Sequence, residues 1–303
     1  MTSPAPYRSA RSVGLVPLVI LLAVGIGWGL AVSLVKFGIA NGIRPYGYLF
    51  WVALGAGVVA MAVCVVRRRL PRLNFAHLRY YALTGAIRLA GANVVFYTAI
   101  EHIPAGVMSV ILGTSPIFTY AMSLAMRMEP FAAARLVGIV SGLAGIVLFL
   151  APRTSLPDPS MAAWVALGLV APFLYSIANI VIDRMRPEGS DSVALAVGML
   201  GAASLIVLMI ALATGSFHVL APPFSLAELG LMLHMVISGL AFYGLFELIR
   251  MSGPTYASQL TYIVTLSGVT FGIVIFGEVH SIWVWSATAL VLGGVGLVNM
   301  RRR

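Results

Sequence analysis

The chain has 303 residues, of which 60% are hydrophobic and only 9% are charged, and its mean hydropathy is +1.01. About a quarter of the residues of a soluble domain are charged, so this composition excludes a soluble globular protein and predicts an integral membrane protein. The net charge of +10 does not indicate nucleic-acid binding, because the arginines gather at the ends of apolar runs. Since about 20 apolar residues cross a bilayer, the chain has room for about ten spans.

Apolar runs follow one another along the whole chain, separated by short polar connections. We predict that each run is a helix, because a lone helix satisfies its own backbone groups in lipid and because barrel strands would alternate in polarity. The basic stretch before Leu15 lacks a cleavage site, so the first run is expected to be a retained helix. The predicted spans are 15–38, 46–66, 79–99, 104–126, 131–150, 161–182, 192–214, 227–249, 254–276 and 281–300.

The positive charges alternate in density from one side of these spans to the other. Of the nineteen Lys and Arg residues, fifteen fall on one side, Lys36, Arg44 and Arg153 fall on the other, and Arg88 lies inside a span. Cytoplasmic loops carry the excess of positive charge, so both termini are predicted to be cytoplasmic, in the inner membrane of a bacterium. The only cysteine, Cys64, lies in a span, which excludes an intrachain disulfide or a cysteine-based metal cluster.

The stretch APRTSLPDPS divides the chain into halves of five spans each. An offset of 149 positions places Glu129 on Glu278 and Ser109 on Ser258, and both halves share a short hairpin, a span, a glutamate and a Gly-rich span. Because five is odd, the second half must enter the membrane inverted, as in transporters with a site near the midplane. The predicted division is a cytoplasmic tail at 1–14, a first repeat at 15–150, a linker at 151–160, a second repeat at 161–300 and a basic tail at 301–303.

Several segments carry a family resemblance: GIGWGLAVSLVKFGI at 25–39, YTAIEHIPAGVMSVILGTSPIF at 97–118, the two glutamates, and the closing spans GIVSGLAGIVLFL and ATALVLGGVGLVNM. With these, the chain resembles the drug/metabolite transporter superfamily, in its EamA-type branch of ten helices. The resemblance covers nearly the whole chain and implies a central cavity lined by the first, third, fourth, sixth, eighth and ninth helices. It leaves the substrate open among amino acids, sugars, nucleotides, vitamins and drugs. One departure is Thr265, which stands where the first half has Pro116.

Arg88 is the most informative single residue, because a charge at the middle of a span is expensive. It is interpreted either as a packing arginine bonded to backbone carbonyls or as a cavity cation for an anionic substrate. No carboxylate lies at similar depth, since Glu101, Asp183 and Glu247 are all near helix ends. His234, on the repeat mate of that helix, is either a hydrogen-bonded packing residue or a substrate or proton ligand.

Further polar and aromatic side chains recur every four residues on the predicted helices, which predicts either helix–helix hydrogen bonds or the walls of a cavity. The candidates for substrate binding, besides Arg88 and His234, are Trp28, Asn93, Tyr97, Tyr175, Asn179, Tyr243, Gln259 and Tyr262.

Four residues are candidates for a gate or hinge: Lys36, Glu101, Gly113 and Pro116. Pro116 is expected to bend the fourth span and to free the Leu112 carbonyl. Lys36 and Glu101 are expected at an outer mouth, although a lysine that snorkels to the interface explains Lys36 equally well.

Glu129 and Glu278 are expected to cap the helix that follows each of them, because a carboxylate stabilises the positive end of a helix dipole. The alternative is that the two glutamates belong to gates.

No motif of a hydrolase, metalloenzyme or nucleotide-dependent enzyme occurs, so no catalytic residue, metal or cofactor is predicted. The sequence predicts an alternating-access carrier for a small amphipathic metabolite, such as an amino acid or a similar carboxylate; export is implied only by the resemblance. The alternatives are a flippase for a lipid-linked substrate and a non-transporting membrane partner of another protein. The identity of the substrate, the coupling ion and the oligomeric state stay open at this point.

Overall fold

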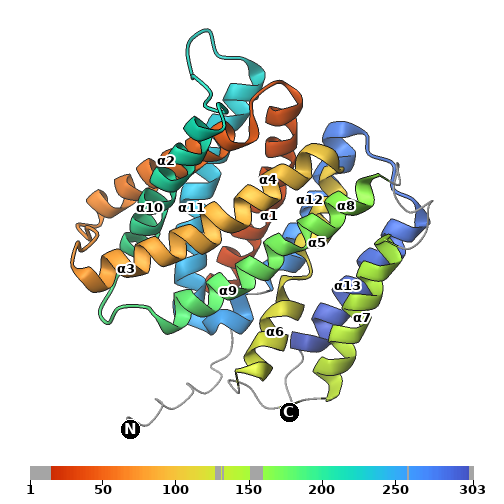
Figure 1. Ribbon diagram of the computed structural model, residues 1–303. Coiled ribbons are helices and arrows are strands. Elements are labelled where there is room, and N and C mark those ends of the chain that lie inside the picture. Colours follow the sequence, from red (N-terminus) through yellow and green to blue (C-terminus); the bar gives the residue numbers. More distant parts are fainter. Residues whose placement is uncertain (1–14, 127–130, 132, 151–159, 258, 300–303) are drawn as a thin grey trace.

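A computed structural model describes residues 15–126, 131, 133–150, 160–257 and 259–299 of the chain, and every regular element among them is a helix. Figure 1 shows these helices as one bundle. The elements are α1 (Leu15–Ala40), α2 (Pro45–Val66), α3 (Phe75–Thr84), η1 (Gly85–Gly91), α4 (Ala92–His102), α5 (Ala105–Leu112), α6 (Ser115–Ala125), α7 (Ala133–Leu150), α8 (Met161–Gly168), α9 (Val170–Arg184), α10 (Ser192–Ala213), α11 (Leu226–Ala257), α12 (Leu260–Phe276) and α13 (Ile282–Asn299).

These elements combine into ten spans, as the hydropathy predicts. α3, η1 and α4 form one continuous span, α5 and α6 form another, and α8 and α9 form a third. Among the described residues, seven helices or continuous helix pairs are long and apolar enough to cross a membrane by length and composition, and α12 and α13 supply shorter apolar helices. The protein is therefore an all-helical, multi-spanning membrane protein.

The two halves run in opposite directions through the bundle. α5 opens the fourth span of the first half, and α12 is the fourth span of the second half. Glu278 follows α12, and its carboxylate accepts hydrogen bonds from the backbone N–H groups of Ala105 at 2.7 Å and Gly106 at 2.9 Å. The start of α5 therefore lies beside the end of α12, so the equivalent spans are antiparallel. This is the inverted repeat that an odd number of spans requires.

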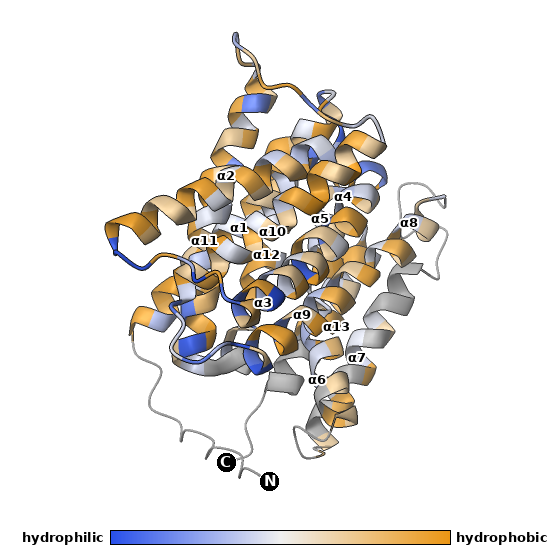
Figure 2. Ribbon diagram, turned by 60° about the vertical axis from the view of Figure 1, so that its left-hand side comes forward, coloured by the Kyte–Doolittle hydropathy of each residue, from blue (hydrophilic) through white to orange (hydrophobic). Residues whose placement is uncertain are grey.

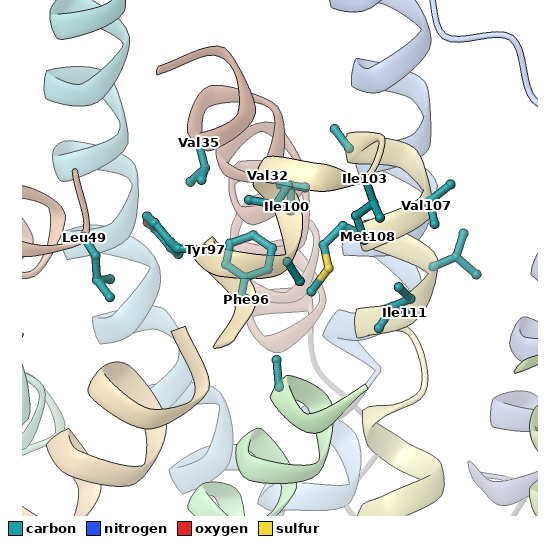
Figure 3. Packing of buried hydrophobic residues seen from close by; sticks show 14 of the residues in the cluster. Val32, Val35, Leu49, Phe96, Tyr97, Ile100, Ile103, Val107, Met108 and Ile111 are labelled. Carbon is teal, nitrogen blue, oxygen red and sulfur yellow. The ribbon is translucent and has the colours of Figure 1, made fainter. Parts of the chain in front are cut away.

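Apolar side chains fill the interior of the bundle and also cover its sides. Figure 3 shows side chains of α4 and α5, among them Phe96, Met108 and Ile111, turned toward one another beside α1. On the sides, large apolar residues such as Leu205 and Met209 are exposed. Figure 2 shows hydrophobic residues along most of the helix surfaces, which is the surface that lipid solvates.

The closing helices of the halves, α7 and α13, pack along each other at one edge of the bundle (Figure 1). Glycines allow this approach: a Cβ atom on Gly145 would lie 3.0 Å from the Ala287 carbonyl oxygen, and one on Gly294 would lie 2.8 Å from the backbone nitrogen of Gly142. Small residues at a contact let two helix backbones approach in a membrane. The Gly-rich closing spans are thus packing surfaces.

The fourth span is interrupted at Gly113 and Thr114, just before Pro116, where the sequence predicts a bend. α5 ends at Leu112, Gly113 and Thr114 form a turn, and α6 begins at Ser115 with the proline in its first turn. Proline suits that position because it needs no partner for a backbone N–H there.

The eighth span also differs from its prediction. α11 continues through residues 250–254 to Ala257, so the expected short hairpin at that place is wrong. Gln259 then precedes α12. By contrast, the matching hairpin of the first half is present, since α4 ends at His102 and α5 starts at Ala105.

Candidate functional site

Arg88 lies on a π-helical segment in the middle of the third span. The backbone N–H of Ala92 bonds to the carbonyl of Ile87, five residues earlier, so the turn around Arg88 contains an extra residue. Such wide turns are frequent at functional sites in helices. The sequence predicted the depth of Arg88 but not this irregularity, which changes the direction of every side chain that follows it.

The guanidinium of Arg88 has one polar partner and several aromatic neighbours. Its Nη1 atom donates a hydrogen bond of 2.9 Å to Oδ1 of Asn179. Its central carbon lies 5.3 Å from the ring centre of Tyr175, 5.7 Å from that of Trp28 and 5.8 Å from that of Phe242, within the range of a cation–π contact. Asn179 is therefore the hydrogen-bond partner of Arg88 that the sequence could not identify.

One donor of this buried cation is unsatisfied. Arg88 is 7% exposed, and its Nε atom has no hydrogen-bond partner in the described part of the chain. No Asp or Glu pairs with it within the part of the chain that the structure describes. An unpaired donor on a buried charge is destabilising unless another group satisfies it.

Arg88 faces a cavity of about 150 Å³ in the middle of the bundle, lined by residues of both halves. The lining includes side chains from α1, the third span, α9, α11 and α12, which agrees with the helices that the family resemblance implies. Seven of the ten candidate binding residues meet at this cavity: Trp28, Arg88, Asn93, Tyr97, Tyr175, Asn179 and His234.

His234 enters the cavity from α11 with a partner that the sequence analysis did not identify. Its Nδ1 atom lies 3.3 Å from the hydroxyl of Tyr48, which is fully buried on α2. The ring of Tyr48 also lies 5.8 Å from that of Tyr97. Tyr48 gave no periodic polar signal in the sequence; in the structure its ring packs closely against Gly38 of α1.

Hydroxyl groups at the broken fourth span complete the polar lining. Ser115, at the start of α6, faces the cavity, and its Oγ atom lies 3.1 Å from that of Ser176 on α9. This pair joins the two halves beside the cavity. Ser238 and Thr261 also line it and were likewise missed, since single hydroxyls in apolar spans do not stand out from packing residues.

Three candidate binding residues do not line the cavity. Tyr243 points to the end of the bundle, where its hydroxyl bonds to the side chain of Arg67. Gln259 occupies the N-cap position of α12, and Tyr262 packs against the hydrophobic cluster of α1, α4 and α5. A four-residue spacing identifies a helix face, but the rotation of the helix in the bundle decides what that face contacts.

Comparisons with known proteins agree with this architecture. The model of the EamA-like transporter family matches residues 15–151 and 162–300. The chain belongs to the EamA-like transporter family. It is 28% identical over 289 residues to the uncharacterized inner membrane transporter YedA of Escherichia coli K12, covering 92% of this chain and 89% of that protein. YedA of Escherichia coli O157:H7 matches to the same extent.

A solved crystal structure shares the fold of this EamA-like transporter. It superposes with a TM-score of 0.65 at 17% sequence identity and covers 93% of this chain and 95% of the other. Membership of the family makes the protein a membrane transporter and not an enzyme.

The residues expected at gates of the transporter have structural contacts of their own. Lys36 donates from Nζ to the carbonyls of Ile100 at 2.8 Å and Glu101 at 3.0 Å, so it joins α1 to the end of α4. A cation at a helix C-terminus is stabilised by the helix dipole. Gly113 lies in the turn that interrupts the fourth span, and Pro116 lies in the first turn of α6 that follows it. The Thr265 hydroxyl, opposite this break, bonds to the Ser109 carbonyl at 3.1 Å.

Glu278 caps a helix, but not the helix that was expected. Its carboxylate binds the start of α5 in the other half, whereas at the start of α13 the backbone carbonyl of Ser281 accepts the first helical hydrogen bonds. The Nε2 atom of His280 lies 3.3 Å from the same carboxylate. Glu278 therefore fastens the two halves together at one end of the bundle. Glu129, the other predicted cap, lies outside the described residues.

We expect Glu278→Ala to lower the stability of the transporter by about 0.5–2 kcal/mol, the usual contribution of a helix cap. Burial raises the pKa of the Glu278 carboxyl, but contacts with His280 and with the N–H groups of Gly106 and Ala105 lower it, and the resulting pKa lies below the ordinary value of 4.5. The stabilisation is therefore complete above pH 4.5 and is lost as the pH falls through the lowered value.

Melting temperatures in detergent from pH 7 down to pH 3 measure this effect, with Glu188→Ala as the control on an exposed loop. The difference between the wild type and Glu278→Ala should narrow in acid. A difference that stays constant over this pH range would contradict the role of the ionised carboxylate.

Proposed function

We propose that the protein is an alternating-access carrier for a small amphipathic metabolite that bears a carboxylate, with amino acids among the candidates. The observation that carries the proposal is the unsatisfied Nε atom of Arg88 at a central cavity, with no acidic partner among the described residues. An arginine binds a carboxylate through two parallel hydrogen bonds. A substrate carboxylate would satisfy both the charge and the free donor.

The aromatic walls fit the other part of such a substrate. Trp28, Phe96 and Phe242 line the cavity beside Arg88 and present apolar rings. Ligand sites typically combine apolar walls with a few polar groups that fix orientation. An amphipathic metabolite would thus place its carboxylate at Arg88 and its apolar part along these rings.

The inverted repeat supplies a way to expose the cavity to each side in turn. Residues of both halves line the cavity, and Glu278 joins the halves at one end of the bundle. In transporters with inverted repeats, one half rocks against the other around a fixed central site. We propose this motion here, with export as its physiological direction.

Uptake by proteoliposomes tests the proposal. Purified protein is reconstituted into liposomes, which are preloaded with one unlabelled carboxylate or amino acid at a time. Counterflow of the same compound in labelled form is then compared with that of liposomes without protein. At least one carboxylate should accumulate transiently. If correctly folded protein shows no counterflow of any carboxylate, the proposal is overturned.

Two other functions from the sequence analysis make different predictions. A flippase for a lipid-linked substrate needs a polar groove that opens toward lipid, and a non-transporting partner needs no polar cavity. The polar groups here converge at the middle of the bundle from α1, α4, α9 and α11, which favours the carrier. Scrambling of a labelled lipid by the proteoliposomes, without counterflow, would favour the flippase.

We further propose that both termini are cytoplasmic and that the protein resides in an inner membrane, as YedA does by its name. The cation count supports this orientation. In the structure, Arg67 contacts Tyr243 of α11, and Arg250 pairs with Glu247 of the same helix, so these cations share one end of the bundle. Arg44 bonds to the carbonyl of Gly215 at the other end.

A reporter that is active only in the periplasm tests the orientation. Fusions after Arg153 or Gly215 should be active, whereas fusions after Gly189 or Arg303 should be inactive. The opposite pattern would refute the proposed orientation without affecting the inverted repeat.

A further inference from the structure

The residues that line the central cavity carry a net positive charge. Arg88 is the only residue with a formal charge at neutral pH among those that line it, and no carboxylate lines it among the described residues. A bound anion with one charge would neutralise the cavity. A zwitterion would bring its own balanced charges and leave the cavity positive.

The amide oxygens that could receive a substrate ammonium already accept one hydrogen bond each. Oδ1 of Asn179 accepts from Arg88, and Oδ1 of Asn93 accepts from the Tyr175 hydroxyl. Each of these oxygens can still accept one more hydrogen bond, but the remaining groups of both amides are N–H donors. Donors suit an anion and not a second cation.

The aromatic rings do not replace the carboxylate that the lining lacks. Trp28, Tyr175 and Phe242 surround the guanidinium of Arg88 at cation–π distances. A substrate ammonium near the same rings would lie close to Arg88 and would be repelled by it. Burying a cation without a partner is strongly unfavourable.

We propose that the substrates are monocarboxylates without an α-ammonium group, such as 2-oxo acids, 2-hydroxy acids or simple carboxylates with an apolar or aromatic body, and that amino acids are excluded. Without a coupled ion, each transport cycle then carries one net negative charge, because the substrate enters as an anion. An inside-negative membrane potential drives such an anion outward. This inference rests on the proposed function and narrows its substrate class.

Matched pairs of compounds test this inference in proteoliposomes at pH 8, where the carboxylic acids are ionised and permeate slowly. The pairs are 3-phenylpropionate with phenylalanine and 4-methylpentanoate with leucine, which differ only in the ammonium group. We expect the ammonium-free member of at least one pair to be taken up about tenfold faster or more, since an unpaired buried charge is strongly disfavoured. Potassium gradients with valinomycin should accelerate its movement toward the positive side.

Arg88→Met and empty liposomes give the background for each compound. A second readout is the melting temperature, which the ammonium-free compound should raise in the wild type but not in Arg88→Met. Amino-acid uptake that equals or exceeds that of its partner would overturn the inference and leave the proposed function standing. Failure of both ammonium-free compounds while an amino acid shows counterflow would also overturn the inference. If no carboxylate shows counterflow, the proposed function itself is overturned.

Discussion

Arg88→Met is expected to leave the transporter folded in the membrane and to abolish carboxylate transport. Placing an arginine at the centre of a membrane helix costs roughly 2.5–3.5 kcal/mol or more, and here its Nε atom has no hydrogen-bond partner among the described residues. Methionine fills a similar volume without a charge, so the melting temperature should stay the same or rise. The lost guanidinium removes the only group that can grip a carboxylate through two hydrogen bonds.

Arg88→Lys should restore transport only in part, because an ammonium keeps the charge but not the planar pair of donors. Arg79→Met is the control, since Arg79 is exposed on α3 and does not line the cavity. Counterflow and thermal stability in detergent are measured for each variant. Normal transport by Arg88→Met, or loss of transport only through unfolding, would make this arginine structural.

Gly294→Val is expected to separate or distort the contact of α7 and α13 and to destabilise the protein by about 1–3 kcal/mol or more, as overpacking does. A Cβ atom at this position would overlap the carbonyl oxygen of Gly138 and lie 2.8 Å from the backbone nitrogen of Gly142. Backbone atoms of a packed helix cannot move aside as a flexible side chain can. The bond from the Ser141 hydroxyl to the Leu290 carbonyl, at 3.1 Å, should be lost as well.

Gly293→Val is the matched control one residue away. A Cβ atom on Gly293 meets no atom within 4 Å, and the two substitutions have the same intrinsic effect on helix propensity. Melting temperatures should therefore fall much further for the change at Gly294 than for the change at Gly293. Equal shifts for the two variants would show that close packing at Gly294 is unimportant for stability.

The sequence by itself predicted the spans, the inverted repeat and the central position of Arg88. Lipid acts as a uniform apolar solvent, so the length of each apolar run sets the number of spans. The same reasoning selected Arg88 and His234, because titratable groups at that depth are rare. Both residues line one cavity, although no sequence pattern connects them directly.

The sequence could not determine which residues meet across the bundle. Tyr175 and Tyr243 both lie on four-residue stripes, yet Tyr175 bonds to Asn93 at the cavity and Tyr243 bonds to Arg67 at the end of the bundle. Hydropathy does not report the rotation of a helix about its axis, which depends on close contacts such as that of Gly38 with Tyr48.

Only the tertiary structure decided how the halves are joined and how Arg88 is directed. Glu278 was expected to cap the helix that follows it, but its carboxylate binds the start of α5, 172 residues away in sequence. The π-helical turn at Arg88 had no local signal, because an added residue in a turn is stabilised by packing and not by intrinsic propensity. The lipid environment determines which segments form membrane helices, whereas packing between the helices determines the partners of each polar side chain.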